Sequence, residues 1–195
     1  MQQKSSNRFS TKLLAYGALL AALAIVFGRA TVFYLPPDAK YTLDKFVLFM
    51  SGMFFGPLLG AFIGFVADFL GGMLFGIGFT PQLCVPAILF GLFGGIFRNF
   101  LKKKFTWSRL AFAYLFPTVI GSIVYQSAAL ALTFYPSTFW FNFQYYLFNR
   151  TIQFAVMLVL EVALIYILLT KTNVFHRTGL WTNTKTKKGS NENDC

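Results

Sequence analysis

Long apolar runs separated by short breaks dominate the chain and predict membrane-spanning helices. The six runs cover residues 13–28, 45–55, 58–75, 82–100, 110–134 and 143–169. The breaks lie at Pro36-Pro37, at Gly56-Pro57, at Gly76, Gly78 and Pro81, and at Tyr135-Pro136-Ser137. Proline lacks an N–H group and restricts the residue before it, so each break ends a helix. Because a bilayer-spanning helix needs about 20 predominantly apolar residues, the pattern predicts an all-α, polytopic membrane protein with six transmembrane helices.

Composition supports this prediction. The chain has 195 residues, of which 56% are hydrophobic and only 12% are charged. Soluble domains average roughly 45–50% apolar and about 25% charged residues, so soluble and disordered classes are excluded. The expected organisation is a cytoplasmic N-terminal segment at 1–12, one transmembrane domain at 13–170 and a polar cytoplasmic tail at 171–195, with no room for a second soluble domain.

The net charge of +11 raises the question of nucleic acid, but its distribution favours a topology signal. Thirteen of the 17 Lys and Arg residues lie before the first run, in the basic segment from Arg98 to Arg109, or in the tail. By the positive-inside rule these three segments face the cytoplasm. We therefore expect both termini to be cytoplasmic, the lipid bilayer of the bacterial plasma membrane to be the environment, and nucleic acid not to be a partner.

Catalytic, metal and cofactor sites are not predicted. The one histidine, His176, lies in the polar tail. The sequence contains no H-E-x-x-H, C-x-x-C, P-loop or G-x-S-x-G motif, which are the patterns that zinc, redox, nucleotide and acyl-transfer sites use. The chain is therefore not expected to be an enzyme, and uphill transport would draw on an ion gradient or on a partner subunit.

An acidic residue within the third run is a candidate ligand acceptor. Asp68 shares a helix face with Gly60 and Gly64, because the three are spaced by four residues. Glycines allow a neighbouring helix to approach closely, and ionisable groups at such positions face a cavity or a partner. The alternative is a structural hydrogen bond or ion pair.

The sixth run carries a polar stripe within about 60° of arc. Its members are Asn142, Tyr146, Asn149 and Gln153. Arg150 lies beside the stripe, and Glu161 lies further along on its fringe. The stripe is either the wall of a polar ligand cavity or a seam against another helix. Arg150 is likewise either a ligand contact or an ion-pair partner of Asp68 or Glu161.

Two further candidates come from the fifth run and the connection that follows it. Gln126 is a polar residue within the run, and Trp140 belongs to an aromatic cluster between the runs. Such a cluster is either an interfacial belt or a surface on which a planar ligand stacks.

The first run contains two overlapping pairs of small residues. Gly17 and Ala21 form one pair, and Ala18 and Ala22 form the other. Either pair provides a groove for close helix contact, within the bundle or with another membrane subunit. We expect Ala18 and Ala22 to serve subunit docking.

These features together resemble the substrate-binding S components of energy-coupling factor (ECF) vitamin transporters. The A-x-x-x-A motif matches Ala18 to Ala22, and the stretch GMFFGPLLGA at 52–61 resembles the pattern G-x-x-x-G-P-x-x-G-A. The resemblance covers about residues 11–172 and is greatest to the folate-specific component, through Phe27-Gly28-Arg29 and Asp68. It implies high-affinity capture of folate outside the cell, with a membrane coupling subunit and two cytoplasmic ATPases as partners.

Folate then suggests roles for the remaining cations. Its glutamate tail carries two carboxylates, and four basic residues remain on the outer side, namely Arg29, Lys40, Lys45 and Arg150. Arg29 and Lys45 flank the first loop and are assigned to the tail carboxylates, Lys40 is expected to be solvated, and Asp68 is assigned to the pterin head. The substrate-binding set is thus Arg29, Lys45, Asp68, Gln126, Trp140, Tyr146, Asn149 and Arg150. The alternatives are another vitamin, such as riboflavin or thiamine, or a non-transport membrane scaffold.

Overall fold

The computed structural model describes residues 11–31, 33–35, 39–74, 81–103, 106–134 and 136–171, and nearly all of them are helical. The helices are α1 (Thr11–Ala30), α2 (Lys45–Phe55), α3 (Pro57–Leu74), α4 (Pro81–Ile96), α5 (Arg98–Lys103), α6 (Trp107–Pro117), α7 (Gln126–Phe134) and α8 (Phe139–Lys171). A π-helical segment, η1 (Thr118–Tyr125), joins α6 to α7, and a 3-10 turn, η2 (Pro136–Thr138), precedes α8. Most of the predicted N-terminal segment, the Gly76/Gly78 break and nearly all of the tail, including His176, lie outside the described residues.

The helix bounds follow the apolar runs closely. The second run was expected at 45–55, and α2 has these bounds. The fifth run is a continuous helix over α6, η1 and α7, but its middle is π-helical because Pro117 lacks the N–H that the regular bonding pattern requires. The fourth run ends earlier than expected, at Ile96, and the basic residues after it begin a separate helix, α5.

The fold is all-α as expected, with a short β-ribbon added between α1 and α2. Strands β1 (Phe33–Leu35) and β2 (Ala39–Tyr41) pair antiparallel, with Tyr34 opposite Lys40. The sequence between the strands contains Pro36 and Pro37, which cannot continue a helix. An extended ribbon pairs the backbone groups of 33–35 with those of 39–41.

Three helical stretches are long and apolar enough to cross a membrane, at Pro57–Leu74, Trp107–Thr133 and Pro136–Thr170. Three more are apolar but shorter, at Leu14–Ala30, Lys45–Phe55 and Cys84–Ile96. The shortness of α2 has a structural reason. All residues from Phe46 to Phe54 are buried, so this helix is surrounded by protein and does not have to match the thickness of the hydrocarbon core.

Glycines join α2, α3 and α4 at van der Waals distance. A Cβ added to Gly52 would lie 2.0 Å from the carbonyl oxygen of Gly91, and one added to Gly60 would lie 2.5 Å from the Cα of Gly52. A Cβ at Gly91 would in turn lie 2.1 Å from the carbonyl oxygen of Gly60. The three backbones therefore touch one another, and no larger residue fits at these positions.

The turn between α2 and α3 completes this packing. Gly56 ends α2 with a positive φ of 95°, a region that favours glycine. Its N–H donates to the carbonyl oxygen of Gly52 at 2.8 Å, and Pro57 begins α3 directly afterwards.

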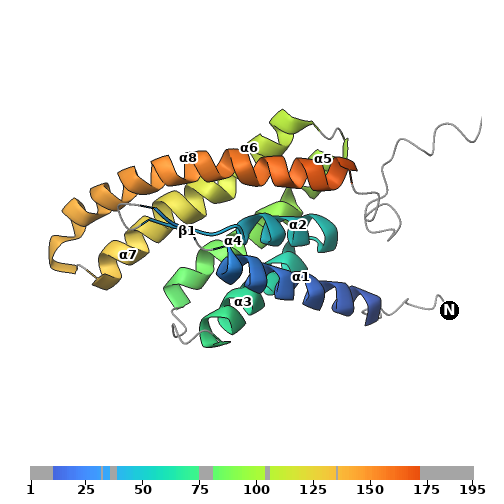
Figure 1. Cartoon of the computed structure of the whole chain (residues 1–195), viewed down its shortest axis with the longest axis horizontal. Coiled ribbons are helices and arrows are strands. Elements are labelled where there is room, and N and C mark those ends of the chain that lie inside the picture. The colour runs from blue at the N-terminus through green and yellow to red at the C-terminus, as the bar shows by residue number, and fades with distance from the viewer. Residues whose placement is uncertain are drawn as a thin grey trace, which may run out of the picture.

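Figure 1 shows α8 as a long helix along one edge of the molecule, with α7 beside it. The beginning of α1, the short α5 and the end of α8 lie toward the same end of the molecule. The basic positions at the beginning of α1, in α5 and at the end of α8 therefore lie toward one end.

We expect Gly52→Ala to destabilise the protein by about 1–3 kcal/mol or more, because overpacking a well-packed core costs that much and the clash here is with backbone. Gly17→Ala is the matched control, since its added Cβ would lie 3.5 Å from the Ile63 side chain, an ordinary contact. Thermal unfolding of the purified protein in detergent measures both. Equal stability of the two variants would contradict the close backbone packing around Gly52.

Candidate functional site

A cavity of about 310 Å³ lies between the helices and is lined by several of their charged and amide side chains. Its size falls within the range of small-molecule sites, roughly 300–1,000 Å³. The lining residues come from α1, α2 and the loop before it, α3, α4, α7 and α8. They are Ala24, Ile25, Gly28, Arg29, Thr42, Asp44, Lys45, Leu48, Ala67, Asp68, Gly71, Gly72, Pro86, Ala87, Gln126, Leu130, Arg150, Gln153 and Phe154.

The cavity is strongly charged, with three cations and two carboxylates in its lining. The cations are Arg29, Lys45 and Arg150, and the carboxylates are Asp44 and Asp68. The lining therefore carries one net positive charge when all five groups are ionised. Ionisable groups among apolar helices are costly and mark functional positions.

Arg29 reaches the cavity from the last turn of α1 and faces α3. Its Nη2 and Nε atoms lie 3.7 and 3.9 Å from the position that a Cβ on Gly71 would occupy. The absence of a side chain at Gly71 therefore makes room for the guanidinium. From this place Arg29 acts electrostatically on the Asp68 carboxyl, one turn earlier on α3.

Lys45 is the first residue of α2, and its ammonium group is held over an aromatic ring of α8. The Lys45 Nζ atom lies 5.0 Å from the centroid of the Phe154 ring, within the range of a cation–π interaction. Both residues line the cavity. The interaction places the ammonium group at the junction between α2 and α8.

Two side-chain oxygens near the cavity are buried and have no hydrogen-bond partner among the described residues. They are Oδ1 of Asp44 and Oε1 of Gln126. An unsatisfied buried acceptor costs about 1–3 kcal/mol. Both residues line the cavity, so a ligand that supplies N–H or O–H donors would satisfy these oxygens.

The π-helical segment determines where Gln126 points. The Gln126 N–H donates to the carbonyl oxygen of Gly121, five residues earlier, instead of four. The wider turn rotates α7 relative to a regular α-helix that continued from α6. Gln126 and Leu130, one turn apart on α7, consequently face the cavity together.

Asp68 is partly buried on α3 and adjoins a cysteine of α4. The Cys84 thiol lies within hydrogen-bonding reach of the Asp68 carboxyl, and its sulfur is 3.9 Å from the Phe65 carbonyl oxygen. Sequence reasoning gave Cys84 no role, although it is a buried neighbour of the candidate acceptor.

The structure brings five of the eight predicted ligand residues together and leaves three outside. Arg29, Lys45, Asp68, Gln126 and Arg150 line the cavity. The other three lie on α8 outside the lining: Trp140 is 73% exposed, and Tyr146 and Asn149 are partly buried. Tyr146 nevertheless acts electrostatically on Arg150, one turn later on the helix.

The predicted polar stripe on α8 is divided by the packing. Gln153 is buried and lines the cavity. Asn142, at the other end of the stripe, donates from Nδ2 to the Thr138 hydroxyl at 2.7 Å and so closes the first turn of α8. Of the four stripe residues, only Gln153 therefore lines the cavity.

The sequence did not point to Asp44, Thr42 or Phe154 as site residues, and Gln153 was expected only as a member of the polar stripe. Asp44 precedes Lys45 at the start of α2, where its carbonyl oxygen accepts the N–H groups of Val47 and Leu48. The position of Asp44 directly before Lys45, a predicted site residue, is the sequence signal that could have identified it. Phe154 is one of 26 phenylalanines, and nothing in the sequence distinguishes it.

The small-residue pairs of α1 face different ways. Ala21 is buried, and a Cβ on Gly17 would contact Ile63 of α3, so this pair packs within the bundle. Ala18 and Ala22 are exposed. Ala18 borders an apolar groove of about 190 Å³, whose lining comprises Leu14, Gly17, Ala18, Ala21, Phe55, Leu59, Phe62, Ile63 and Val66.

Comparison with known proteins places the fold among vitamin transporters. Residues 8–171 match the family described as ECF-type riboflavin transporter, S component. The folate transporter FolT of Clostridium novyi (strain NT) is 30% identical over 125 residues, which cover 62% of this chain and 69% of that protein.

A solved structure extends this similarity to nearly the whole fold. The crystal structure of FolT bound with folic acid matches with a TM-score of 0.70 and 28% sequence identity, over 84% of this chain and 95% of that one. The matching family and both relatives are transport proteins, in agreement with the prediction that the chain is not an enzyme.

Proposed function

Because the chain belongs to the ECF-type riboflavin transporter S component family, we propose that it captures a vitamin for uptake and that this vitamin is folate. The charge of the cavity is the observation that supports this choice of vitamin. Three cations face two carboxylates, so the cavity favours an anion. Folate is a dianion, riboflavin is neutral and thiamine is a cation. The similarity to FolT supports the same choice.

The charged groups suit the two ends of folate. The 2-amino-4-oxo pyrimidine edge of the pterin presents adjacent N–H donors, and the Asp68 carboxylate accepts both in charge-assisted hydrogen bonds. Arg29 binds the glutamate tail, because a guanidinium holds a carboxylate bidentately, and Lys45 assists it. Gln126 and Arg150 complete the binding set from α7 and α8.

Trp140, Tyr146 and Asn149 are assigned different places in this proposal. Trp140 is exposed at the start of α8 and belongs to an interfacial aromatic belt. Tyr146 supports Arg150 through its electrostatic interaction. Asn149, beside Arg150, borders the site without lining the cavity.

The membrane topology is part of the proposal. The six apolar stretches form six spans, with α2 shielded from lipid by its neighbours. The beginning of α1, α5 and the end of α8 lie at one end of the molecule (Figure 1), and the basic residues there support a cytoplasmic orientation of that end in a bacterial cell. The transmembrane domain covers 13–170, flanked by cytoplasmic segments at 1–12 and 171–195.

Transport requires partners that supply energy. We assign Ala18 and Ala22 to the contact with a membrane coupling subunit, which two cytoplasmic ATPases drive. The exposure of both alanines supports this role, because a small residue that packs within the bundle would be covered. A non-transport scaffold would not need a charged cavity.

The test of the ligand is a comparison of folate with pteroate, which lacks the glutamate and its two carboxylates. Arg29→Ala should weaken folate by about 10- to 100-fold, since hydrogen bonds to charged groups contribute about 1.5–3 kcal/mol, and should weaken pteroate far less. Calorimetric titration of the purified protein measures both affinities. Arg109→Ala, at the cytoplasmic end, is the control. Equal losses for folate and pteroate would remove Arg29 from the tail site.

Asp68→Asn should weaken folate and pteroate alike, by at least about tenfold or 1.4 kcal/mol. The substitution preserves shape but replaces one acceptor oxygen with a donor, so one pterin N–H loses its partner. The same titrations measure the effect. An unchanged affinity in a folded Asp68→Asn variant would show that another group binds the pterin.

If Ala18 and Ala22 serve docking, replacing them should impair folate uptake without impairing folate binding. Replacing Ala18 and Ala22 with Trp should abolish folate uptake by cells and leave folate binding by the isolated protein intact, because the bulk blocks an outer contact. The matched control replaces Val156 and Val159 with Trp, since both are 60% exposed on α8; it should preserve uptake and binding. Loss of binding in the alanine double variant would place these residues inside the bundle.

A further inference from the structure

A buried carboxyl group lies on α8 beyond the cavity. Glu161 is only 1% exposed, and its Oε2 atom accepts a hydrogen bond of 2.6 Å from the Tyr114 hydroxyl of α6. Its other oxygen, Oε1, is buried without a hydrogen-bond partner among the described residues. The ligand site described above does not include Glu161.

The tyrosine that binds this carboxyl group belongs to a buried aromatic cluster. The Tyr114 ring lies 5.0 Å from that of Phe49 and 5.3 Å from that of Phe90, measured between centroids, and all three residues are fully buried. A carboxylate in such surroundings needs a compensating cation nearby, or else it takes up a proton.

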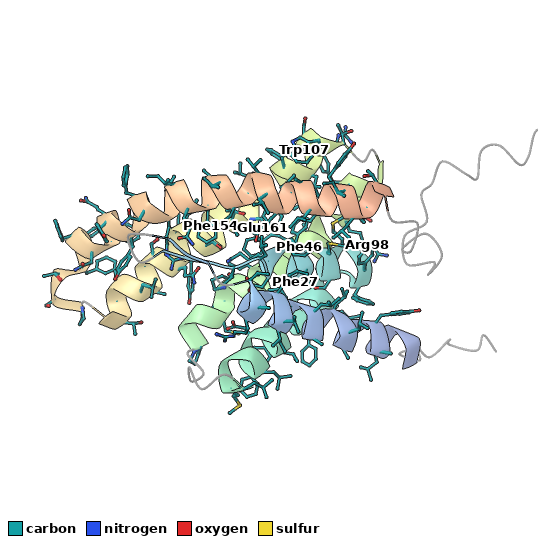
Figure 2. The ribbon with its side chains drawn as sticks, viewed as in Figure 1. Phe27, Phe46, Arg98, Trp107, Phe154 and Glu161 are labelled. Carbon is teal, nitrogen blue, oxygen red and sulfur yellow. The ribbon has the colours of Figure 1, made fainter. Side chains whose placement is uncertain are left out.

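Lys45 is the cation whose charge acts on this carboxyl group. The titratable groups that act on Glu161 are Lys45 and Asp44 at the start of α2, and Tyr114 of α6. Of these only Lys45 is a cation. Its ammonium group is held over Phe154, which precedes Glu161 by seven residues and therefore lies on nearly the same face of α8. Figure 2 shows Phe154 and Glu161 next to each other along this helix.

Lys45 thus acts on Glu161 and is also accessible to a carboxylate of a ligand in the cavity. It lines the cavity, where a ligand carboxylate would reach it, and it also acts on the buried Glu161. A ligand anion on the ammonium group would cancel the charge that stabilises ionised Glu161, while Asp44 remains as a second negative neighbour.

We propose that Glu161 is a positioning residue for the cation that receives the ligand anion, and that it takes up one proton when the anion binds to Lys45. The inference rests on the proposed function, because it requires a carboxylate ligand. In this step a proton from water adds to one Glu161 carboxylate oxygen. Lys45 remains an ammonium group, and no bond of the ligand changes.

The direction of the pH effect follows from linkage. A complex that binds one proton more than the free protein forms more readily as pH falls, by up to tenfold per pH unit. Folate affinity should therefore rise on acidification over the range in which free protein holds Glu161 ionised. A ligand without a carboxylate should show no such dependence through Glu161.

The test is calorimetric titration of the full chain in buffers of different ionisation enthalpy at one pH, which counts the protons taken up per ligand. We expect uptake approaching one proton with folate and none with 6-hydroxymethylpterin, which carries no carboxylate. Glu161→Gln should bind folate without proton uptake and with a flattened pH profile, and its amide oxygen still accepts from Tyr114. Tyr114→Phe retains the carboxyl group and should retain the uptake.

Each outcome distinguishes this inference from the function on which it rests. Tight folate binding by the unaltered protein without proton uptake overturns the inference and leaves the proposed ligand intact. Uptake that persists in Glu161→Gln assigns the proton to another group, with Asp44 the first candidate, and also overturns it. Failure of the unaltered protein to bind folate at all contradicts the proposed function itself.

Discussion

The contact of three glycine backbones is the constraint on which the rest of the structure depends. Gly52, Gly60 and Gly91 bring α2, α3 and α4 so close together that a single added methyl group would meet backbone atoms. This packing allows an 11-residue helix, α2, to be surrounded by protein. It also fixes the start of α2 beside the middle of α3, where Lys45 and Asp68 face one cavity.

The opposite wall of the cavity depends on a different device. Pro117 and the π-helical segment after it rotate α7 so that Gln126 faces inward, and α8 adds Arg150 and Phe154. Charged groups of both signs can then lie in an apolar bundle, because each has a neighbour that moderates its cost: Arg29 acts on Asp68, and Lys45 lies over an aromatic ring. An anionic ligand fits the one positive charge that remains.

The elements were largely predictable from the sequence, because apolar runs and proline-containing breaks determine where helices can form. The same reasoning identified Arg29, Lys45, Asp68, Gln126 and Arg150, since a polar group within an apolar run needs a reason to be there. Which residues line the cavity beyond these depends on tertiary structure. Whether Asn149 or Arg150 faces the cavity, or Gly17 or Ala18 faces the bundle, is decided by the neighbouring helix. Prolines mark where the β-ribbon and the π-helical segment interrupt the α-helices, but the form of each interruption and the position of Phe154 are decided by the packing around them.

The matching family is named for riboflavin, whereas the solved relative was crystallised with folic acid. The charge of the cavity therefore decides between the vitamins, and it is the central claim. The most direct measurement is an equilibrium titration of the ligand-free protein with folate, riboflavin and thiamine under one condition. We expect saturable one-to-one binding of folate and no binding of riboflavin or thiamine. Saturable binding of riboflavin with no response to folate would contradict it.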